Sequence, residues 1–479
     1  MSGSEQPSRE ELLALIESQA RVIGELTARV AAQEARIAEL QRQLGRNSRN
    51  SSQPPSTDGP TVSPSRAERR RSGRRPGKQP GAGGSALYPV SNPNEVIDHL
   101  PDACGGCGSD LAGGRPAGMV CRQVHDIPAV IGRDVVEHRL HRRRCGCGAV
   151  TTADAPPGVG APVVYGPNLR ALAVYLLVFQ HIPVARTAQL IAEVTGARPS
   201  TGWISSVLLT VADVLVDVEK LIKSLIVLAH VIHVDETSAN INGANINGAR
   251  WWLHVASTDK LTGYHLHRSR GRAAVTEFDV LPAFGGTVVR DALSVYDSYH
   301  QARHALCGAH LGRELVAAAE ADPDQAWPQQ ALRALYGLNT AAHQARDQHI
   351  PAIPPEIADP LLDSWRHALL VGLAEHRRVP GRRQSKTRNL LERLRDRDEQ
   401  VLLFARDLSV PFTNNQAERD VRPTKTQMKI SGCHRSETTA KAWLRVRGYI
   451  STVRKHGDNV LDALRDAITG NPWKPPLAC

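Results

Sequence analysis

The stretch Val231-Ile232-His233-Val234-Asp235-Glu236-Thr237 constrains the fold more than any other part of this 479-residue chain. Apolar and polar residues alternate in it and β-branched residues dominate, which predicts a strand with a buried face. We expect the strand to end at Asp235, because a turn-rich loop follows. A carboxylate at the end of a buried strand is a good candidate for a metal ligand.

The elements that follow this strand come in an informative order. They are a second strand, a third strand, a helix and a fourth strand, predicted at residues 251–257, 263–267, 273–281 and 287–290. This order is typical of a ribonuclease-H-like core, in which the first and fourth strands are neighbours. Asp291 ends the fourth strand, so Asp235 and Asp291 could share a metal ion.

A five-residue tandem duplication lies in the same region. Ala239-Asn-Ile-Asn-Gly243 is followed directly by Ala244-Asn-Ile-Asn-Gly248. An insertion of odd length inside a strand would turn every later side chain to the opposite face of the sheet. The duplication is therefore expected in a hairpin loop, where Asn-Gly is favoured.

Glu418 is the candidate for a third carboxylate. It lies in the first turns of a predicted helix, with Thr413 or Asn414 as the N-cap. A cationic helix could hold phosphates while Glu418 binds a metal ion, and its basic residues are Arg419, Arg422, Lys425 and Lys429. Glu418 could equally form helix salt bridges. Glu236 and Asp297 remain alternatives to Asp235 and Asp291.

These residue types suit phosphoryl transfer. Magnesium (or manganese) prefers oxygen ligands and is usually held by a few carboxylates. Two such ions about 3.5–4 Å apart would activate a water or a 3′-hydroxyl and stabilise the leaving oxygen. No side-chain nucleophile is evident in the sequence, and this chemistry needs none.

The charge of the chain points to a polyanionic partner. The net charge is +11 and the pI is near 9.5, although a basic protein without such a partner has the same composition. Residues 47–92 are predicted to be a basic disordered linker. The run of basic residues in this linker could contact DNA phosphates or could be a solvated tail. The candidate DNA-binding residues in it are Arg69, Arg70, Arg71, Arg74 and Arg75.

Residues 1–46 carry heptads with β-branched residues in one row and mostly leucine in the other. This pattern favours a parallel coiled-coil dimer, although a helix packed on its own protein is the alternative. The first row is Ile16, Ile23, Val30, Ile37 and Leu44, and the second is Leu12, Gln19, Leu26, Gln33 and Leu40.

Four of the eight cysteines form two close pairs within residues 93–150. Thiolates on glycine-rich turns can hold a structural zinc ion, so we predict a small zinc-binding β module with ligands Cys104, Cys107, Cys145 and Cys147. Cys121, His125 or His141 could replace one ligand, and free thiols are the alternative. Cys307 and His310 could bind metal or pack near the active site.

The remaining segments are predicted to be helical. Residues 155–228 contain a helix, a short glycine turn and a helix, which is the helix-turn-helix pattern but is shared by ordinary bundles. Residues 323–400 are expected to be a helical insertion, and its basic segment could follow DNA or be a solvated surface. Residues 441–479 form a helical tail. No signal peptide or membrane-spanning run is evident, so we expect a cytoplasmic, nucleoid-associated protein.

Several segments resemble those of bacterial insertion-sequence transposases of the sixty-six family. The likeness covers nearly the whole chain, including the heptads, the Asn-Ser-Arg-Asn-Ser-Ser stretch and the cysteine pairs. The segments that carry it are His233-Val-Asp-Glu-Thr237, Trp251-Trp-Leu-His-Val-Ala-Ser-Thr-Asp259, Cys307-Gly-Ala-His310-Leu-Gly-Arg313-Glu314, Asn414-Asn-Gln-Ala-Glu-Arg419, Ser431-Gly-Cys-His-Arg-Ser-Glu437 and Tyr449-Ile-Ser-Thr-Val-Arg-Lys455.

The resemblance implies a DDE transposase with a ribonuclease-H-like catalytic domain at residues 229–440. Matched motif by motif, it makes Asp235, Asp291 and Glu418 the acidic triad. Such an enzyme binds the inverted repeats of its element, cuts a strand there and joins the 3′-hydroxyl to target DNA. Small accessory proteins encoded beside it could be further partners.

The chain departs from the family at Asp291, which Ala292-Leu293 follows where the family usually has glycine and an aromatic residue. A missing glycine could alter the turn that directs the carboxylate. Together with the duplication, this leaves a rival interpretation, a non-catalytic DNA-binding protein from a degraded element. A further rival is a structure-specific nuclease of the same fold that does not join ends.

Overall fold

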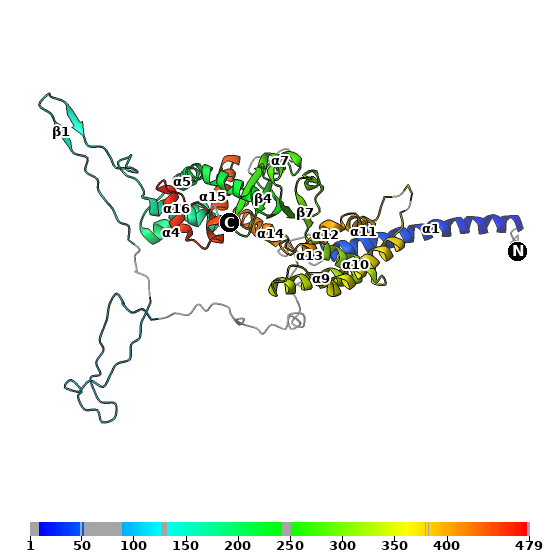
Figure 1. Ribbon diagram of the computed structural model, residues 1–479, viewed down its shortest axis with the longest axis horizontal. Coiled ribbons are helices and arrows are strands. Elements are labelled where there is room, and N and C mark those ends of the chain that lie inside the picture. Colours follow the sequence, from blue (N-terminus) through cyan, green and yellow to red (C-terminus); the bar gives the residue numbers. More distant parts are fainter. Residues whose placement is uncertain are drawn as a thin grey trace, which may run out of the picture. The chain divides into compact units, whose positions relative to one another are not determined.

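The computed structural model describes residues 9–47, 50–51, 89–125, 132–241, 251–378, 380–381 and 383–476. The chain combines helices with a mixed sheet and divides into two units (Figure 1). The larger unit contains the described parts of residues 1–62, 138–190 and 198–479, and the smaller unit contains those of residues 63–137 and 191–197.

A five-stranded sheet forms the centre of the larger unit, with the strand order β5-β4-β3-β6-β7. The first three strands pair antiparallel, whereas β6 runs parallel to β3 and β7 runs parallel to β6. The predicted neighbourhood of the first and fourth strands, β3 and β6, is therefore confirmed. The strands are β3 (Val231–Ala239), β4 (Trp251–Ser257), β5 (Thr262–His267), β6 (Thr287–Arg290) and β7 (Arg303–Leu306).

The prediction that the first strand ends at Asp235 is wrong. β3 continues to Ala239, because the antiparallel ladder with β4 runs on until Ala239 pairs with Trp251. Only the parallel ladder with β6 stops before Asp235, at His233. The duplication begins at Ala239, the last residue of β3, and the rest of it lies between β3 and β4, as predicted. Its residues 242–248 are outside the described part of the chain.

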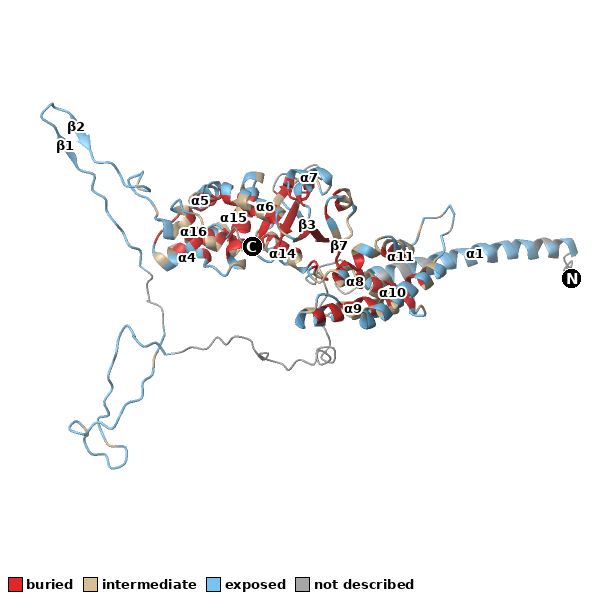
Figure 2. Cartoon of the chain, in the orientation of Figure 1, coloured by how far each residue is buried: buried red, intermediate tan, exposed pale blue. Residues whose placement is uncertain are grey.

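Helices from distant parts of the chain cover this sheet. α14 (Asn415–Ser431) packs on β3 and β4, and α15 (Glu437–Lys455) packs on β5. The predicted helical tail is confirmed as α15 and α16 (Val460–Ile468). Trp443 and Tyr449 of α15 are almost fully buried, so α15 supplies much of the apolar cover (Figure 2).

The helices before the sheet begin where the local signals indicate. Ser200 caps α5 by accepting a hydrogen bond from the Trp203 backbone N–H at 3.1 Å. Gly196 precedes this cap with φ +69°, a left-handed turn that favours glycine. DNA recognition by this segment stays a prediction. The helices are α3 (Pro167–Val174), continued by the π-turn η3 (Tyr175–Phe179), α4 (Val184–Thr195), α5 (Thr201–Val214) and α6 (Val216–Val227).

The segment between β7 and α14 is largely helical, which confirms the predicted helical character of residues 323–400. Its long helices enclose a hydrophobic core of their own, in which Trp327 and Trp365 are buried. The helices are α8 (Gly308–Ala321), α9 (Trp327–Asp347), α10 (Pro355–Glu375), α11 (Lys386–Asp396), α12 (Asp398–Val401) and α13 (Leu403–Arg406).

The heptad region forms one helix, α1 (Arg9–Leu44). Its apolar rows have no cover within the described chain, since Ile16, Ile23 and Ile37 are 54–63 % exposed (Figure 2). Dimerisation through these rows stays a prediction. After α1, the Asn50 side chain donates a hydrogen bond to Glu320 of α8 at 2.7 Å.

The second cysteine pair lies at the turn between two short antiparallel strands, β1 (Arg142–Arg144) and β2 (Val150–Thr152). Cys145 N–H donates to Ala149 O, and Cys104 N–H donates to Ser109 O, so each pair begins a local turn. Cys104 and Cys107 belong to the smaller unit, whereas Cys145 and Cys147 belong to the larger one. Zinc binding stays a prediction.

No single helix among the described residues is both long and apolar enough to cross a membrane. One bent pair, α5 with α6, meets the criteria of length and composition.

We expect Gly308→Ala to destabilise the fold, because a Cβ at this position would clash with the Phe412 ring. Overpacking of this kind costs about 1–3 kcal/mol, which should lower the melting temperature by several degrees. Gly202→Ala is the matched control, since its Cβ would meet only the Ser200 hydroxyl at 3.8 Å. Equal melting temperatures for wild type and Gly308→Ala would show that the α8 start does not pack closely on Phe412.

Candidate active site

The register of the sheet brings two of the three candidate carboxylates side by side. In the parallel ladder, Val231 pairs with Thr287 and His233 pairs with Val289. Continuing this register by two residues aligns Asp235 with Asp291. Neighbouring strands lie about 4.8 Å apart, so both aspartates leave the ladder at the same edge of the sheet.

Asp235 lies in an environment that opposes its ionisation. Burial raises the pKa of its carboxyl to about 8, and the nearby carboxylates of Glu236, Asp291 and Glu418 add to this rise. The Glu236 backbone N–H donates to Asp235 Oδ1 at 2.8 Å and partly offsets it. No arginine or lysine among the described residues forms a salt bridge with Asp235 or Asp291.

The turn after Asp291 forms without the glycine usual in the family. Leu293 N–H donates to Asp291 Oδ1 at 2.9 Å, which closes a turn through the side chain. Arg290 supports it by donating to the Asp291 carbonyl oxygen at 3.0 Å. Ala292 and Leu293 are not among the residues with positive φ, so this turn has no need of glycine.

The two alternative carboxylates are engaged in structural contacts. Glu236 accepts from Arg270 Nε at 2.9 Å and from the Tyr296 hydroxyl at 2.6 Å. Asp297 pairs with Arg290 at 2.6 Å and with Arg397 at 2.7 Å. Each of these carboxylates therefore has an arginine partner, whereas Asp235 and Asp291 each accept only a backbone N–H among the described residues.

Asn414 joins the helix that carries Glu418 to the strand that carries Asp235. Its Nδ2 donates to the Val234 carbonyl oxygen at 2.7 Å, and its Oδ1 lies 3.1 Å from His233 Nδ1. Burial lowers the pKa of His233 to about 4, so this ring is neutral and its Nδ1–H donates to Asn414. Asn414 holds the N-cap position, as predicted, but its side chain does not cap the helix.

Glu418 faces residues of α8. Its Oε1 lies 3.8 Å from His310 Nδ1 and 3.7 Å from an Arg313 guanidinium nitrogen. Donor atoms of Cys307, His310 and Glu418 all lie within 4.8 Å of one another, and no other such group occurs among the described residues. The three predicted carboxylates therefore do not converge as closely on one point.

The other predicted DNA ligands divide into two sets. Arg419 and Arg422 are exposed on α14 and Lys425 is half-buried. The linker candidates lie outside the described residues, and they are Arg69, Arg70, Arg71, Arg74 and Arg75.

Several arginines in the basic segment of the insertion form ion pairs within the protein. Arg378 and Arg388 both bind Glu392, and Arg393 binds Glu314. These arginines stabilise the helices, so they are not all free to form a DNA surface.

Two family models match the chain. Residues 162–442 match the transposase IS66 family, and this match spans the sheet, the helical insertion and all three candidate carboxylates. The chain belongs to the IS66 transposase family. Residues 3–87 match a family of unknown function, DUF6444, which spans α1 and the linker. Comparison with curated proteins gives no match.

Family membership makes this protein an insertion-sequence transposase, that is, an enzyme that binds and cuts DNA. The resemblance to the sixty-six family is thereby confirmed. The roles of individual residues rest on the geometry above.

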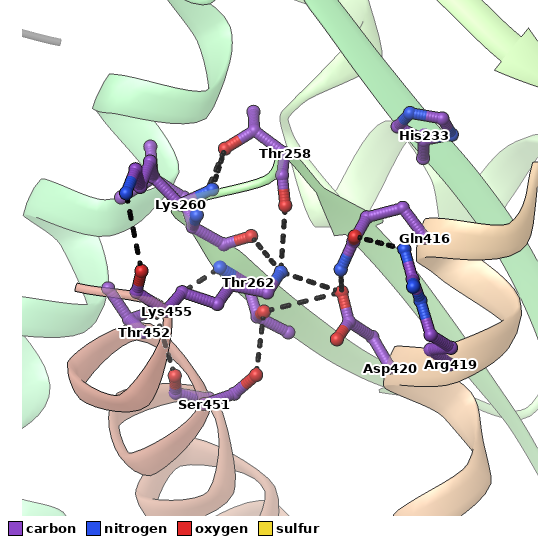
Figure 3. A network of polar contacts seen from close by, with 12 residues as sticks. His233, Thr258, Lys260, Thr262, Gln416, Arg419, Asp420, Ser451, Thr452 and Lys455 are labelled. Atoms are coloured by element: carbon purple, nitrogen blue, oxygen red, sulfur yellow. Dashed lines mark hydrogen bonds and ion pairs between the residues drawn. The ribbon is translucent and has the colours of Figure 1, made fainter. Parts of the chain in front are cut away.

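A largely buried ion pair holds the transposase helix α14 against α15 (Figure 3). Lys455 Nζ donates to Asp420 Oδ2 at 2.8 Å and to the carbonyl oxygens of Thr258 and Leu261 at 2.8 and 2.9 Å. Gln416 also donates to Asp420 Oδ2, at 3.0 Å. All three Lys455 protons are therefore used, and the pair fixes α14 two residues after Glu418.

Sequence reasoning missed Asn414 as a link to β3, the approach of Arg313 to Glu418, and the ion pair of Asp420 with Lys455. The Asn414-Asn415 doublet indicated a helix cap, but nothing local indicated its distant partners. The acid at Asp420 could only have been distinguished by its position on the buried face of α14.

We expect Asp235→Asn to remove a pH dependence of stability. The folded-state pKa of about 8 lies above the ordinary value of 3.8, so the wild type loses stability as pH rises between these values. In EDTA, the free energy of unfolding of Asp235→Asn relative to that of the wild type should increase by up to about 1.4 kcal/mol per pH unit over this range. Melting temperatures from pH 5 to 9 test this. A stability difference between wild type and Asp235→Asn that stays constant with pH would contradict the shift.

We expect Lys455→Met to destabilise the transposase by about 3–5 kcal/mol, because Asp420 would stay buried without its partner. The double variant Asp420→Asn/Lys455→Met should recover most of this loss. A double-mutant cycle in urea, followed by circular dichroism, measures the coupling. Additive effects of the two substitutions would mean that the pair does not stabilise α14.

Proposed function

We propose that this transposase is a DDE enzyme with a ribonuclease-H-like core. It would cut DNA at the inverted repeats of its element and join the 3′-hydroxyl ends to target DNA. The observation that carries this proposal is the parallel register that aligns Asp235 with Asp291. Asn414 supports it, because this residue fixes the helix of Glu418 to the same strand.

The donor set at the two aspartates suits magnesium or manganese. The donors that the strand register brings together are the carboxylates of Asp235 and Asp291, and hard divalent cations prefer oxygen ligands. Burial, with a smaller contribution from the neighbouring carboxylates, raises the Asp235 pKa, and a bound cation would stabilise the ionised carboxylate against both effects. Glu236 and Asp297, by contrast, already have arginine partners.

In this proposal the carboxylates of Asp235 and Asp291 hold one ion, and Glu418 holds a second. Bound ions supply activation of the attacking water or 3′-hydroxyl and stabilisation of the leaving oxygen. The Leu293 amide orients the Asp291 carboxylate. Arg419 and Arg422, exposed on the helix of Glu418, would hold DNA phosphates.

The exposed apolar rows of α1 support a homodimer. Five β-branched or leucine side chains repeat every seven residues and have no apolar cover within the described chain. A second copy of α1 is the partner that this repeat fits. Two catalytic domains held in this way could act on the two ends of one element.

A cleavage and joining assay on labelled DNA with the element's own ends tests the proposal. We expect Asp235→Asn, Asp291→Asn and Glu418→Gln each to lower cleavage in magnesium by about 100-fold or more while DNA binding persists. Loss of metal ligands leaves the phosphate contacts intact, which is why binding and cutting should separate.

Asp363→Asn is the matched control, because this aspartate is 77 % exposed on α10 and pairs only with Arg366 among its described partners. It should cut at the wild-type rate. A wild-type protein that binds the ends but never cuts, even with accessory proteins added, would favour the non-catalytic DNA-binding interpretation. Cutting without preference for the ends, and without joining, would favour a structure-specific nuclease.

A further inference from the structure

Two buried polar atoms face each other beside α8 without a hydrogen-bond partner. They are His310 Nδ1 and Glu418 Oε1, which lie 3.8 Å apart. Buried polar atoms are nearly always paired, and leaving one unpaired costs about 1–3 kcal/mol. A separation of 3.8 Å is too long for a direct hydrogen bond, so neither atom satisfies the other, whereas an ion bound between them would satisfy both.

A single metal ion is small enough to fill this position. Zinc lies about 2.0–2.2 Å from nitrogen and oxygen ligands, and two such distances together exceed the 3.8 Å separation. The third donor is the Cys307 sulfur, which is within 4.8 Å of the other two donor atoms. The Asn414 backbone N–H donates to this sulfur at 3.2 Å, as amides commonly do for metal-binding thiolates.

The three donors differ in kind from those of the magnesium chemistry proposed above. Sulfur and imidazole nitrogen favour zinc and related transition metals, whereas magnesium requires oxygen. Three protein ligands leave the fourth tetrahedral position to water or to a substrate oxygen.

We propose that Cys307, His310 and Glu418 form a binding site for a zinc-class divalent ion, and that filling it inhibits cleavage. The Glu418 carboxylate is also the proposed ligand of the second magnesium ion, and an ion held between its Oε1 and His310 would draw it away from that magnesium. Zinc would therefore compete for the third carboxylate of the triad. The inhibitory half of this inference rests on the proposed function, whereas the binding half does not.

Arg313 provides a test that distinguishes a metal site from a purely structural cluster, because its charge should weaken metal binding. One guanidinium nitrogen lies 3.7 Å from Glu418 Oε1, and another donates to the Ser51 carbonyl oxygen at 3.5 Å. Its positive charge opposes a cation on the same oxygen. We therefore expect Arg313→Ala to bind zinc more tightly than the wild type, although it removes a contact to Glu418.

Zinc stoichiometry of the full chain tests the binding half directly. After dialysis against buffered zinc, Cys307→Ser and His310→Gln should each hold one tightly bound ion fewer than the wild type, as measured by elemental analysis. Cys433→Ser is the matched control, because this thiol is exposed and lies outside the group. Equal stoichiometry in all four proteins would overturn the site.

Cobalt substitution gives a second readout that does not depend on activity. The wild type minus Cys307→Ser difference spectrum should contain a sulfur-to-cobalt charge-transfer band, and the Cys433→Ser difference should not. Melting temperatures in EDTA identify any variant that fails to fold, and His310→Gln leaves the buried sulfur in place. A featureless difference spectrum between folded proteins would contradict coordination by Cys307.

Zinc titration of DNA cleavage in excess magnesium tests the inhibitory half, with each protein normalised to its own zinc-free rate. The half-inhibitory zinc concentration should rise at least 10-fold in Cys307→Ser and fall in Arg313→Ala. Equal inhibition of wild type and Cys307→Ser would overturn this half. A protein that never cuts DNA would refute the proposed function, while the stoichiometry would still decide the site.

Discussion

The candidate site depends on one buried amide, that of Asn414. This side chain is 1 % exposed and bonds to residues about 180 positions earlier in the chain. An amide suits the position because it donates to the Val234 carbonyl and accepts from His233 with one planar group. It is also neutral, so it joins the elements that carry Asp235 and Glu418 without adding charge between them. The long segment between β7 and α14 therefore returns to the sheet at the residue beside Asp235.

Charge is distributed unevenly among the acids at this edge of the sheet. Glu236 and Asp297 have arginine partners, and these pairs link the strands to neighbouring loops and helices. Asp235 and Asp291 have only backbone N–H donors. Buried carboxylates without cationic partners are unfavourable unless a cation binds them. The structural acids Glu236 and Asp297 are thus neutralised by arginines. Asp235 and Asp291, which the register of β3 and β6 aligns, have no cationic partner among the described residues.

Local patterns were sufficient for much of the fold. Alternation of apolar and polar residues predicted β3, and the odd length of the duplication placed it in the loop after this strand, where all of it except Ala239 lies. The end of β3 could not be predicted in this way, because pairing with β4 extends the strand past Asp235. The contacts of Asn414, Arg313 and Lys455 also escaped prediction, since their partners lie far away in sequence and no period encodes them. The carboxylates were found by residue type, but their surroundings are a product of tertiary structure.

The helical insertion explains how the third carboxylate can be so distant from the first two. A segment with its own core adds little closure entropy, so about a hundred residues can separate β7 from α14. It must still be anchored, or α14 would return in many positions. Asp297 supplies one anchor by binding Arg290 at the end of β6 and Arg397 after α11. Arg393 and Glu314 supply another, between α11 and α8. Because α8 also carries His310 and Arg313, the same anchors fix the surroundings of Glu418.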